Sequence, residues 1–466
     1  MSSRPDRTTM RKSLPVPTKL LARIASAAIA LLCSVWLVAC PFCLAPPQTF
    51  SERMLLSDVV VIAELVKFEV LNNGQVPKST LRIRHILRGD EQLAARFGIS
   101  SGRITVLPAE ATGKPGDFFL MFGDLPNLSD DLPEVAASNS SGDAVTTEEN
   151  SSKKIPVLTA SISKTVSGPA VKKASLFQKV SWEIPGAVVW ADFDALSPAG
   201  VDYVRRLPSR DLPAQERLAF FNAFLESPDP NIAEDSWAEF GGAAYGDVKA
   251  VRHLFQRDKL RAWIADPLMS PERLGLYGLM LGLCGEASDA DFLRAHQRDA
   301  KTGEFRFGGE GLMAGYLLLT REDGLQLCRE EVLSADATDS LRHAFIQSLQ
   351  FFKSYEPDLL SSESICQSMR DMLAIPSMRD IAIINLARWE DWTVLPQLMT
   401  IFETEYANDP AGQKIVLQYA EACQKAAAKK SETEEAACVA SDFIVRMKQK
   451  YGSLNKAAAF EFRAPQ

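Results

Sequence analysis

Several features that mark common classes of active site are absent from this sequence. It has only four histidines, and His253, His296 and His343 lie in different apolar patterns without a triad-like partner. A single Cys-X-X-Cys motif occurs, so a structural zinc site, which takes four ligands, is not predicted. The one glycine cluster, at 307–311, lacks the lysine and Ser/Thr of a phosphate-binding loop. We therefore predict no catalytic residue, no metal and no cofactor, and thus no enzyme.

An excess of basic charge is also missing. Lys and Arg number 51 against 59 Asp and Glu, which gives a formal net charge of -8. Such a surface repels a phosphate backbone, and no basic stripe interleaved with aromatic residues offsets it. Nucleic acid is therefore excluded as a predicted partner. With 466 residues, of which 46% are hydrophobic, the chain has room for two or more domains.

The first 39 residues combine a basic segment through Arg23 with an uncharged apolar run from Ile24 to Ala39. The run is shorter than the roughly 20 residues of a comfortable membrane span, and its basic flank is typical of an export signal. We predict a signal peptide at 1–39. The run ends Leu37-Val38-Ala39-Cys40, which resembles a bacterial lipobox and implies acylation of Cys40. The protein would then be anchored in the cell envelope, facing the periplasm or the exterior; the alternative is ordinary cleavage with Cys40 unmodified.

The motif Cys40-Pro41-Phe42-Cys43 also suggests thiol-disulfide exchange or a local disulfide through Cys40 and Cys43. Thiol oxidoreductases need the first cysteine at a helix N-terminus, where the helix dipole lowers the thiol pKa. Here the prolines of Leu44-Ala45-Pro46-Pro47 follow and disfavour a helix. An acylated sulfur cannot attack a disulfide, so anchoring and redox chemistry exclude each other at Cys40.

Residues 40–123 show a strand-rich pattern. A β-branched apolar run at 59–66 is followed by an alternating run at 80–88 and an apolar run at 118–122. After the cysteine pair and a short helix, this order resembles the netrin-like OB-barrel domain, which includes the tissue inhibitors of metalloproteinases. The resemblance implies a small β-barrel. No cysteine lies between Cys43 and Cys284, so the family's disulfides do not carry over. Protease inhibition, which the resemblance also implies, needs a free, unacylated Cys40 and is a third alternative.

The next segment, 124–180, is rich in Ser, Asp, Glu, Asn and Thr and has few large apolar residues. It cannot offset its ordering entropy by burial, so we predict a disordered insertion or linker. Residues 181–212 form a connecting segment whose apolar runs fit either late strands or a tether. Ser197 and Pro198 are placed as the N-cap and first residue of a helix.

Residues 213–451 carry apolar faces at helical spacing with short charged breaks. Markers in these breaks, Ala287, Glu322, Tyr355 and Asp391, are 35, 33 and 36 residues apart. A period of this size indicates stacked helical pairs, and the pattern resembles a HEAT-type α-solenoid. The clearest pair is predicted at 381–402, and a polar tail at 452–466 follows the array.

Within the array, Gly275, Gly278, Gly282 and Gly285 recur at helical spacing, which favours close helix packing over a ligand surface. Trp389 and Trp392 flank the turn of the clearest pair. They are candidates for a partner-binding spot, with core packing as the alternative. The cysteines of the array are interpreted as small buried residues, although Cys423 and Cys438 flank a charged segment and fit a pair in an oxidising compartment.

The sequence thus predicts an α+β multidomain protein, with a small β-barrel-like domain before a HEAT-like helical solenoid. As a whole it resembles a family of exported proteins of planctomycete-type bacteria for which no activity can be carried over. The predicted function is a non-catalytic, lipid-anchored scaffold that binds a protein partner; the alternative is thiol-disulfide exchange through Cys40 and Cys43.

Overall fold

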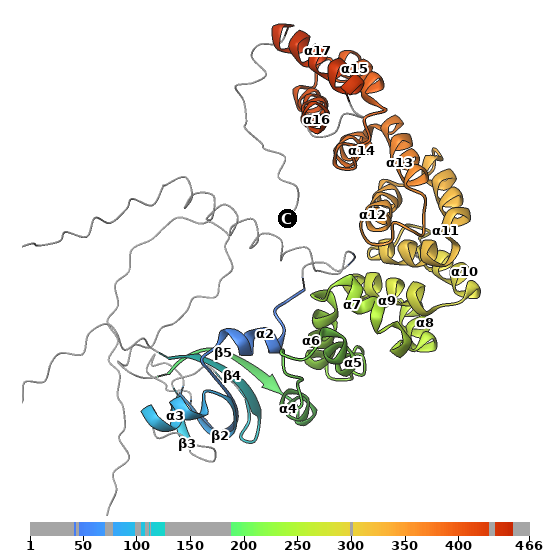
Figure 1. Ribbon diagram of the computed structural model, residues 1–466. Coiled ribbons are helices and arrows are strands. Elements are labelled where there is room, and N and C mark those ends of the chain that lie inside the picture. The colour runs from blue at the N-terminus through green and yellow to red at the C-terminus, as the bar shows by residue number, and fades with distance from the viewer. Residues whose placement is uncertain are drawn as a thin grey trace, which may run out of the picture. The chain divides into compact units, whose positions relative to one another are not determined.

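The computed structural model divides the chain into two compact units (Figure 1). It describes residues 42, 46–69, 78–97, 104–107, 111, 113–125, 188–298, 302–427 and 434–450. The sheet unit comprises Gln48–Arg210 and Phe224–Ser236, and the helical unit comprises Met1–Pro47, Asp211–Ala223 and Trp237–Gln466. The chain is therefore α+β, with a small antiparallel sheet in its N-terminal part and many helices after it.

Some predictions concern residues outside the described ranges. They are the signal peptide at 1–39, the acylation or redox role of Cys40 and Cys43, the predicted insertion at 124–180 except for Asp124, which ends β4, and Leu125, and the tail at 452–466. They stay predictions.

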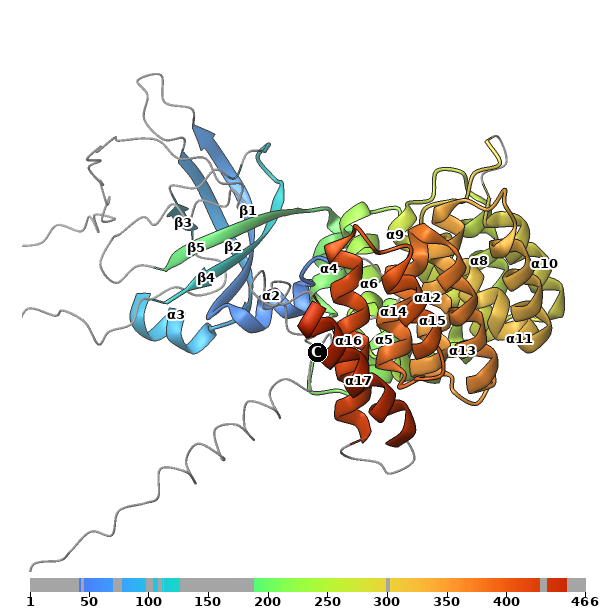
Figure 2. The ribbon, with the colours of Figure 1, turned by 90° about the horizontal axis from the view of Figure 1, so that it is seen from above.

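The sheet unit contains five antiparallel strands in the order β3-β2-β1-β4-β5 (Figure 2). The strands are β1 (Val59–Glu69), β2 (Lys78–Arg88), β3 (Ile104–Leu107), β4 (Phe118–Asp124) and β5 (Val189–Leu196). β3 and β5 are the edge strands, and no pairing between them closes the sheet within the described residues. The expectation of a closed barrel is therefore wrong. β3 has four residues and pairs only with Ser79 to Arg82 of β2, so it offers few backbone groups for closure.

The fifth strand comes from the segment that fits either a late strand or a tether. β5 pairs with β4 along its length, from Leu196 opposite Phe118 to Val189 opposite Asp124. The sheet thus continues beyond residue 123. Residues 126–187 connect, in the sequence, two strands that are hydrogen-bonded neighbours in the sheet.

Strand β1 is the centre of the sheet and is buried on both faces. Alternate residues from Val59 to Leu65 join a core with β2, β4 and Leu93 of helix α3 (Asp90–Phe97). The intervening Val60 and Ile62 are also fully buried. A strand covered on both faces reads as a continuous apolar run, which explains the sequence pattern at 59–66.

A buried carboxylate joins the helices of the sheet unit. Asp235 of α6 (Pro230–Gly241) accepts hydrogen bonds from the backbone of Phe50, at the start of α2 (Phe50–Leu56), and from the hydroxyl of Tyr203 in α4 (Pro198–Arg205). The distances are 2.6 and 2.7 Å. A buried carboxylate without such partners is costly, so these hydrogen bonds stabilise one arrangement of the three helices.

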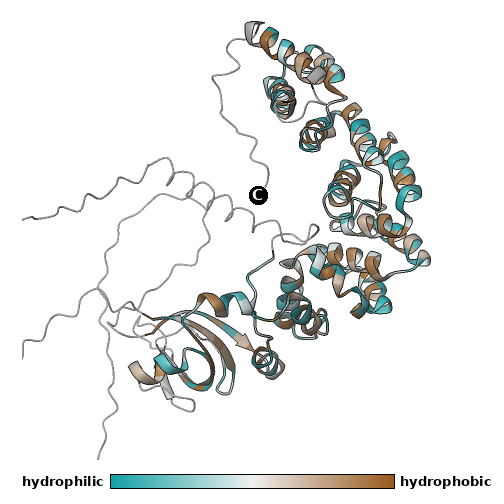
Figure 3. Cartoon of the chain, viewed as in Figure 1, coloured by the Kyte–Doolittle hydropathy of each residue, from teal (hydrophilic) through white to brown (hydrophobic). Residues whose placement is uncertain are grey.

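The helical unit consists of helices that pack mainly on neighbours in the sequence. They are α5 (Ala214–Phe221), α7 (Tyr245–Ala250), α8 (Arg257–Ala265), α9 (Pro271–Cys284), α10 (Ala287–His296), α11 (Gly309–Leu333), α12 (Asp339–Tyr355), α13 (Ser362–Asp371), α14 (Pro376–Arg388), α15 (Leu395–Glu403), α16 (Pro410–Ala427) and α17 (Glu434–Lys450). α8 packs on α9, α10 and α12 pack on α11, and α16 packs on α17. Figure 3 shows both hydrophobic and hydrophilic residues on each helix, as expected where one side is covered.

Two predicted breaks of the array are observed. The turn predicted within 381–402 lies between α14 and α15, but the two helices do not pack on each other as a pair: α14 packs on α16, and α15 packs on α16 and α17. α11 is interrupted at Arg321, whose φ of 54° and ψ of -132° are not helical, so two helices meet at the predicted charged turn.

The glycines of α9 permit a close contact with α11, as the packing interpretation predicts. A Cβ at Gly278 would lie 2.5 Å from the backbone nitrogen of Leu312, and a Cβ at Gly282 would collide with Gly315. Gly311 and Gly315 of α11 face α9 in the same way. Gly285 differs, because it is the C-cap of α9 and approaches Leu281 and Asp289 instead.

Candidate functional site

The turn between α14 and α15 carries both tryptophans that the sequence singles out. The backbone N–H groups of Trp389 and Asp391 donate to the last carbonyls of α14, at Asn385 and Leu386, and so end the helix. Glu390 has a φ of 58°, a left-handed conformation that is uncommon for residues other than glycine. The turn is therefore held in a defined shape, and it separates the two indoles.

Trp392 belongs to the core. It is buried, and its ring lies edge-on to Tyr419 of α16 with centroids 5.2 Å apart. The Tyr419 hydroxyl donates to the carbonyl of Asp391, which ties α16 to the turn. The indole Nε1 of Trp392 is buried without a hydrogen-bond partner. For Trp392 the structure thus favours the packing alternative over partner binding.

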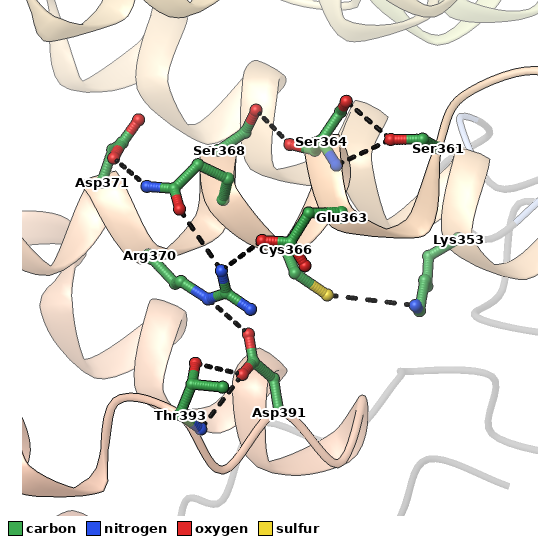
Figure 4. Close-up of polar contacts among 11 residues, drawn as sticks. Lys353, Ser361, Glu363, Ser364, Cys366, Ser368, Arg370, Asp371, Asp391 and Thr393 are labelled. Carbon is green, nitrogen blue, oxygen red and sulfur yellow. Dashed lines mark hydrogen bonds and ion pairs between the residues drawn. The ribbon is translucent and has the colours of Figure 1, made fainter.

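Trp389 is only half-buried and carries a cation on its ring. Nζ of Lys353, in α12, lies 5.9 Å from the ring centroid, within the range of a cation–π interaction. The same ammonium donates to Ser362 of α13. It also lies 4.0 Å from Sγ of Cys366 in the same helix (Figure 4). Trp389 therefore presents an aromatic surface beside a positioned positive charge.

An ion pair between the buried Asp391 of the turn and the partly buried Arg370 of α13 stabilises the turn. Nε of Arg370 donates to Asp391 at 2.7 Å and its Nη1 donates to Glu363 at 2.6 Å (Figure 4). Burial alone would raise the pKa of the Asp391 carboxyl, but hydrogen bonds from Arg370 and Thr393 outweigh it, and the net pKa lies below the ordinary value. The carboxylate is thus held ionised, and the Arg370 side chain is fixed between two acids.

Burial makes three thiols of the helical unit, those of Cys284, Cys328 and Cys366, poor nucleophiles. Burial raises the pKa of Cys366, raises that of Cys284 to about 11, and raises that of Cys328 to about 12. Cys423 is buried, Cys438 is exposed, and both are free thiols. The Lys353 ammonium near Cys366 opposes the effect of burial without reversing it.

A second feature of the helical unit is a docked aromatic residue that no pattern in the sequence indicates. Phe42, inside the Cys-X-X-Cys motif, is 4% exposed and packs on Phe351 of α12 with ring centroids 5.2 Å apart. Phe351 in turn contacts the ring of Tyr245 at 5.0 Å. A Cβ at Gly275 of α9 would lie 2.6 Å from the carbonyl oxygen of Phe42, so the glycine leaves room for the docked segment.

A buried carboxylate binds one member of the aromatic cluster formed by Phe42, Phe351 and Tyr245. Glu356, at the end of α12, accepts hydrogen bonds from the Tyr245 hydroxyl and from Nζ of Lys249, each at 2.5 Å. Burial and the neighbouring carboxylate raise the pKa of Tyr245, so its hydroxyl stays protonated and orients the ring that faces Phe351.

Other candidate chemistry finds no site in the described part of the chain. Its His, Cys, Asp and Glu residues form no group that is suited to a metal ion. His253 and His296 each bond a carbonyl of their own helical region, at Ala250 and Phe292. None of the described helices is long and apolar enough to cross a bilayer.

No protein-family model, no curated protein and no solved structure matches this chain.

Proposed function

We propose that this chain is a non-catalytic, exported envelope protein, held to a membrane by acylation of Cys40, whose HEAT-like helical unit binds a protein partner. The partner would contact the turn between α14 and α15, with Trp389 as its aromatic anchor.

The surface of Trp389 is the observation that carries this proposal. Tryptophan is enriched among residues that dominate binding energies, and a half-buried indole on a rigid turn loses little conformational freedom on binding. Trp392, Asp391 and Arg370 hold that turn from beneath. Lys353 supplies a positive charge, so the partner would offer an aromatic or apolar side chain next to an acidic group.

The docking of Phe42 supports anchoring by lipid rather than thiol-disulfide exchange. Cys40 precedes Phe42 by two residues, which span at most about 7 Å. Phe42 is buried, whereas exchange requires a thiolate nearby that is accessible to a protein disulfide, so the burial of Phe42 favours the anchor over exchange.

Site-specific photocrosslinking tests the partner surface. A benzophenone amino acid is placed at Trp389 in cells, and at Trp263 as a matched control, since Trp263 is also half-buried and packs on Tyr277. We expect a discrete crosslinked protein at position 389 that is absent at 263 and lost with Lys353→Glu. Equal products at both positions would contradict the proposal.

The anchor is tested separately by the intact mass of the protein from its own membranes. An added mass of lipid size that disappears in Cys40→Ala supports acylation. An unmodified N-terminus would overturn the anchor and would make disulfide-reduction assays the next measurement.

A further inference from the structure

The two most exposed large hydrophobic side chains of the described chain lie on adjacent loops. Leu268, between α8 and α9, is 89% exposed, and Phe307, directly before α11, is 82% exposed. Each protrudes singly from a loop, and neither contributes to the core of the helical unit. A single exposed apolar side chain is ordinary on a protein surface, but two such side chains on neighbouring loops are a candidate interaction site.

Arg306 connects the two loops through hydrogen bonds. One guanidinium nitrogen of Arg306 donates to the carbonyl of Ile264 at 3.1 Å, and the other approaches the carbonyl of Asp266 at 3.5 Å. Phe307 follows Arg306 directly, and Leu268 follows Asp266 by two residues. The backbone N–H of Leu268 also donates to the Asp266 side chain at 2.8 Å. Both side chains are thus presented by a hydrogen-bonded pair of loops.

The same edge of the helical unit holds Phe42. A Cβ at Gly275, near the start of α9, would lie 2.6 Å from the carbonyl oxygen of Phe42 and 3.6 Å from that of Gly308. Gly308 is the N-cap of α11 and follows Phe307 directly. The docked N-terminal segment, the start of α9 and the start of α11 therefore meet at one place.

We infer that Leu268 and Phe307 enter the membrane surface beside the lipid anchor and orient the helical unit on the bilayer. The inference rests on the proposed acylation of Cys40, which one residue separates in the sequence from the buried Phe42. An acyl anchor followed by a long flexible chain leaves orientation free, whereas an anchor next to a docked residue brings one edge to the lipid. Single protruding apolar side chains fit the region of head groups and upper acyl chains, whereas a groove would fit a peptide.

The test replaces the natural anchor, so that it does not depend on acylation. The full mature chain, with Cys40→Ser and a histidine tag in place of residues 1–39, is held on phosphatidylcholine vesicles by nickel-chelating lipid. The acyl chains carry bromine, which quenches tryptophan at membrane depth. Uncharged head groups avoid repulsion of this acidic chain.

Phe307→Trp and Leu268→Trp are compared with Val445→Trp, a matched control in α17 that is 54% exposed. We expect the emission added at positions 307 and 268 to be quenched and shifted to shorter wavelength, and that added at 445 to be unchanged. Equal emission at all three positions would overturn the inference. Self-association on the vesicles or in solution that is lost with Leu268→Ser and Phe307→Ser, without quenching, would also overturn it in favour of a second copy as the occupant.

This experiment separates the two proposals. Quenching on the artificial anchor, combined with an unmodified natural Cys40, leaves the membrane-contacting edge standing and removes the lipid anchor. A modified natural Cys40 without quenching on the artificial anchor supports the lipid anchor and removes the membrane-contacting edge.

Discussion

The ring of Phe42 packs against the ring of Phe351 at 5.2 Å, which fixes the segment after the predicted export signal to helix α12. In the Cys-X-X-Cys motif, the residue that packs on the helical unit is therefore Phe42, which lies between the two cysteines. The contact also explains why Gly275 of α9 lacks a side chain, because the Phe42 backbone occupies the space that a Cβ would need.

Removing the Phe42 ring should destabilise the helical unit. We expect Phe42→Ala to lower the free energy of unfolding by about 3 kcal/mol, because a buried phenylalanine is lost and a cavity remains against Phe351. Urea denaturation followed by circular dichroism measures the change. Phe307→Ala, which removes an exposed ring, should alter the free energy by less than about 0.5 kcal/mol. Similar values for the two variants would show that Phe42 is not docked in solution.

The contact of α9 with α11 should not tolerate a methyl group. Gly282→Ala places a Cβ against the backbone of Gly315, so the helices must separate, and we expect a loss of about 2 kcal/mol or more. Gly246→Ala in α7 is the matched control, since no atom lies within 4 Å of its added Cβ. There the better helix propensity of alanine should stabilise by about 0.5–1 kcal/mol. Thermal melts of both variants show whether each substitution lowers or raises the melting temperature.

Local patterns in the sequence predicted the local structure. The turn within 381–402, the N-cap at Ser197, whose side chain accepts from Gly200 at 2.9 Å, and the glycine contact of α9 follow from the spacing of neighbouring residues. The packing of α14 and α15 on α16, instead of on each other, does not. Such features depend on hydrogen bonds and side chains within a few turns of one helix.

Contacts between distant segments were not predicted. The open sheet depends on where β5 pairs, and β5 follows β4 by more than 60 residues. The docking of Phe42 depends on the coincidence of a glycine in α9 and an aromatic surface on α12. The only signal for it in the sequence was a phenylalanine between two cysteines, and a single aromatic residue does not indicate which helix it contacts.

The candidate site was predicted in part. Both tryptophans flank the charged turn, and neither has a neighbour in the sequence that indicates a core or a surface position. Their difference arises from Tyr419, which lies in a later helix and covers only Trp392. Lys353 and Cys366 also come from other helices, and nothing near Trp389 in the sequence indicates them.

The two tryptophans should therefore respond differently to truncation. Trp392→Ala should lower the free energy of unfolding by about 3–5 kcal/mol, because it removes a buried ring packed on Tyr419. Trp389→Ala should cost no more than about 1 kcal/mol, the scale of an exposed cation–π contact with Lys353. Denaturant titrations of both variants test this. A larger loss for Trp389 would assign it to the core and remove it as a binding residue.

The pair of Arg370 and Asp391 should make stability depend on pH in acid. The folded-state pKa of Asp391 is depressed, so its contribution is complete above the unfolded pKa, near 4, and is lost as the pH falls through the folded value. We expect Asp391→Asn to cost about 2 kcal/mol at neutral pH and progressively less below about pH 4. Denaturation from pH 7 to pH 3 checks this. Asp336→Asn, at an exposed site, should leave the profile unchanged.

The free thiols should react in an order set by exposure. Cys438 is exposed, whereas Cys328 is 3% exposed and burial raises its pKa to about 12, so almost none of it is thiolate at neutral pH. A thiol reagent added to the folded protein should therefore label Cys438 rapidly, and should reach Cys328 and Cys423 only as the protein unfolds. Cys438→Ser should remove the fast phase, and peptide mapping identifies the labelled residue. Protein isolated from its own cells gives a second outcome. If both Cys423 and Cys438 stay unlabelled there even after unfolding without reductant, the two form a disulfide, and α16 must shift from the arrangement in which Cys423 is free and buried.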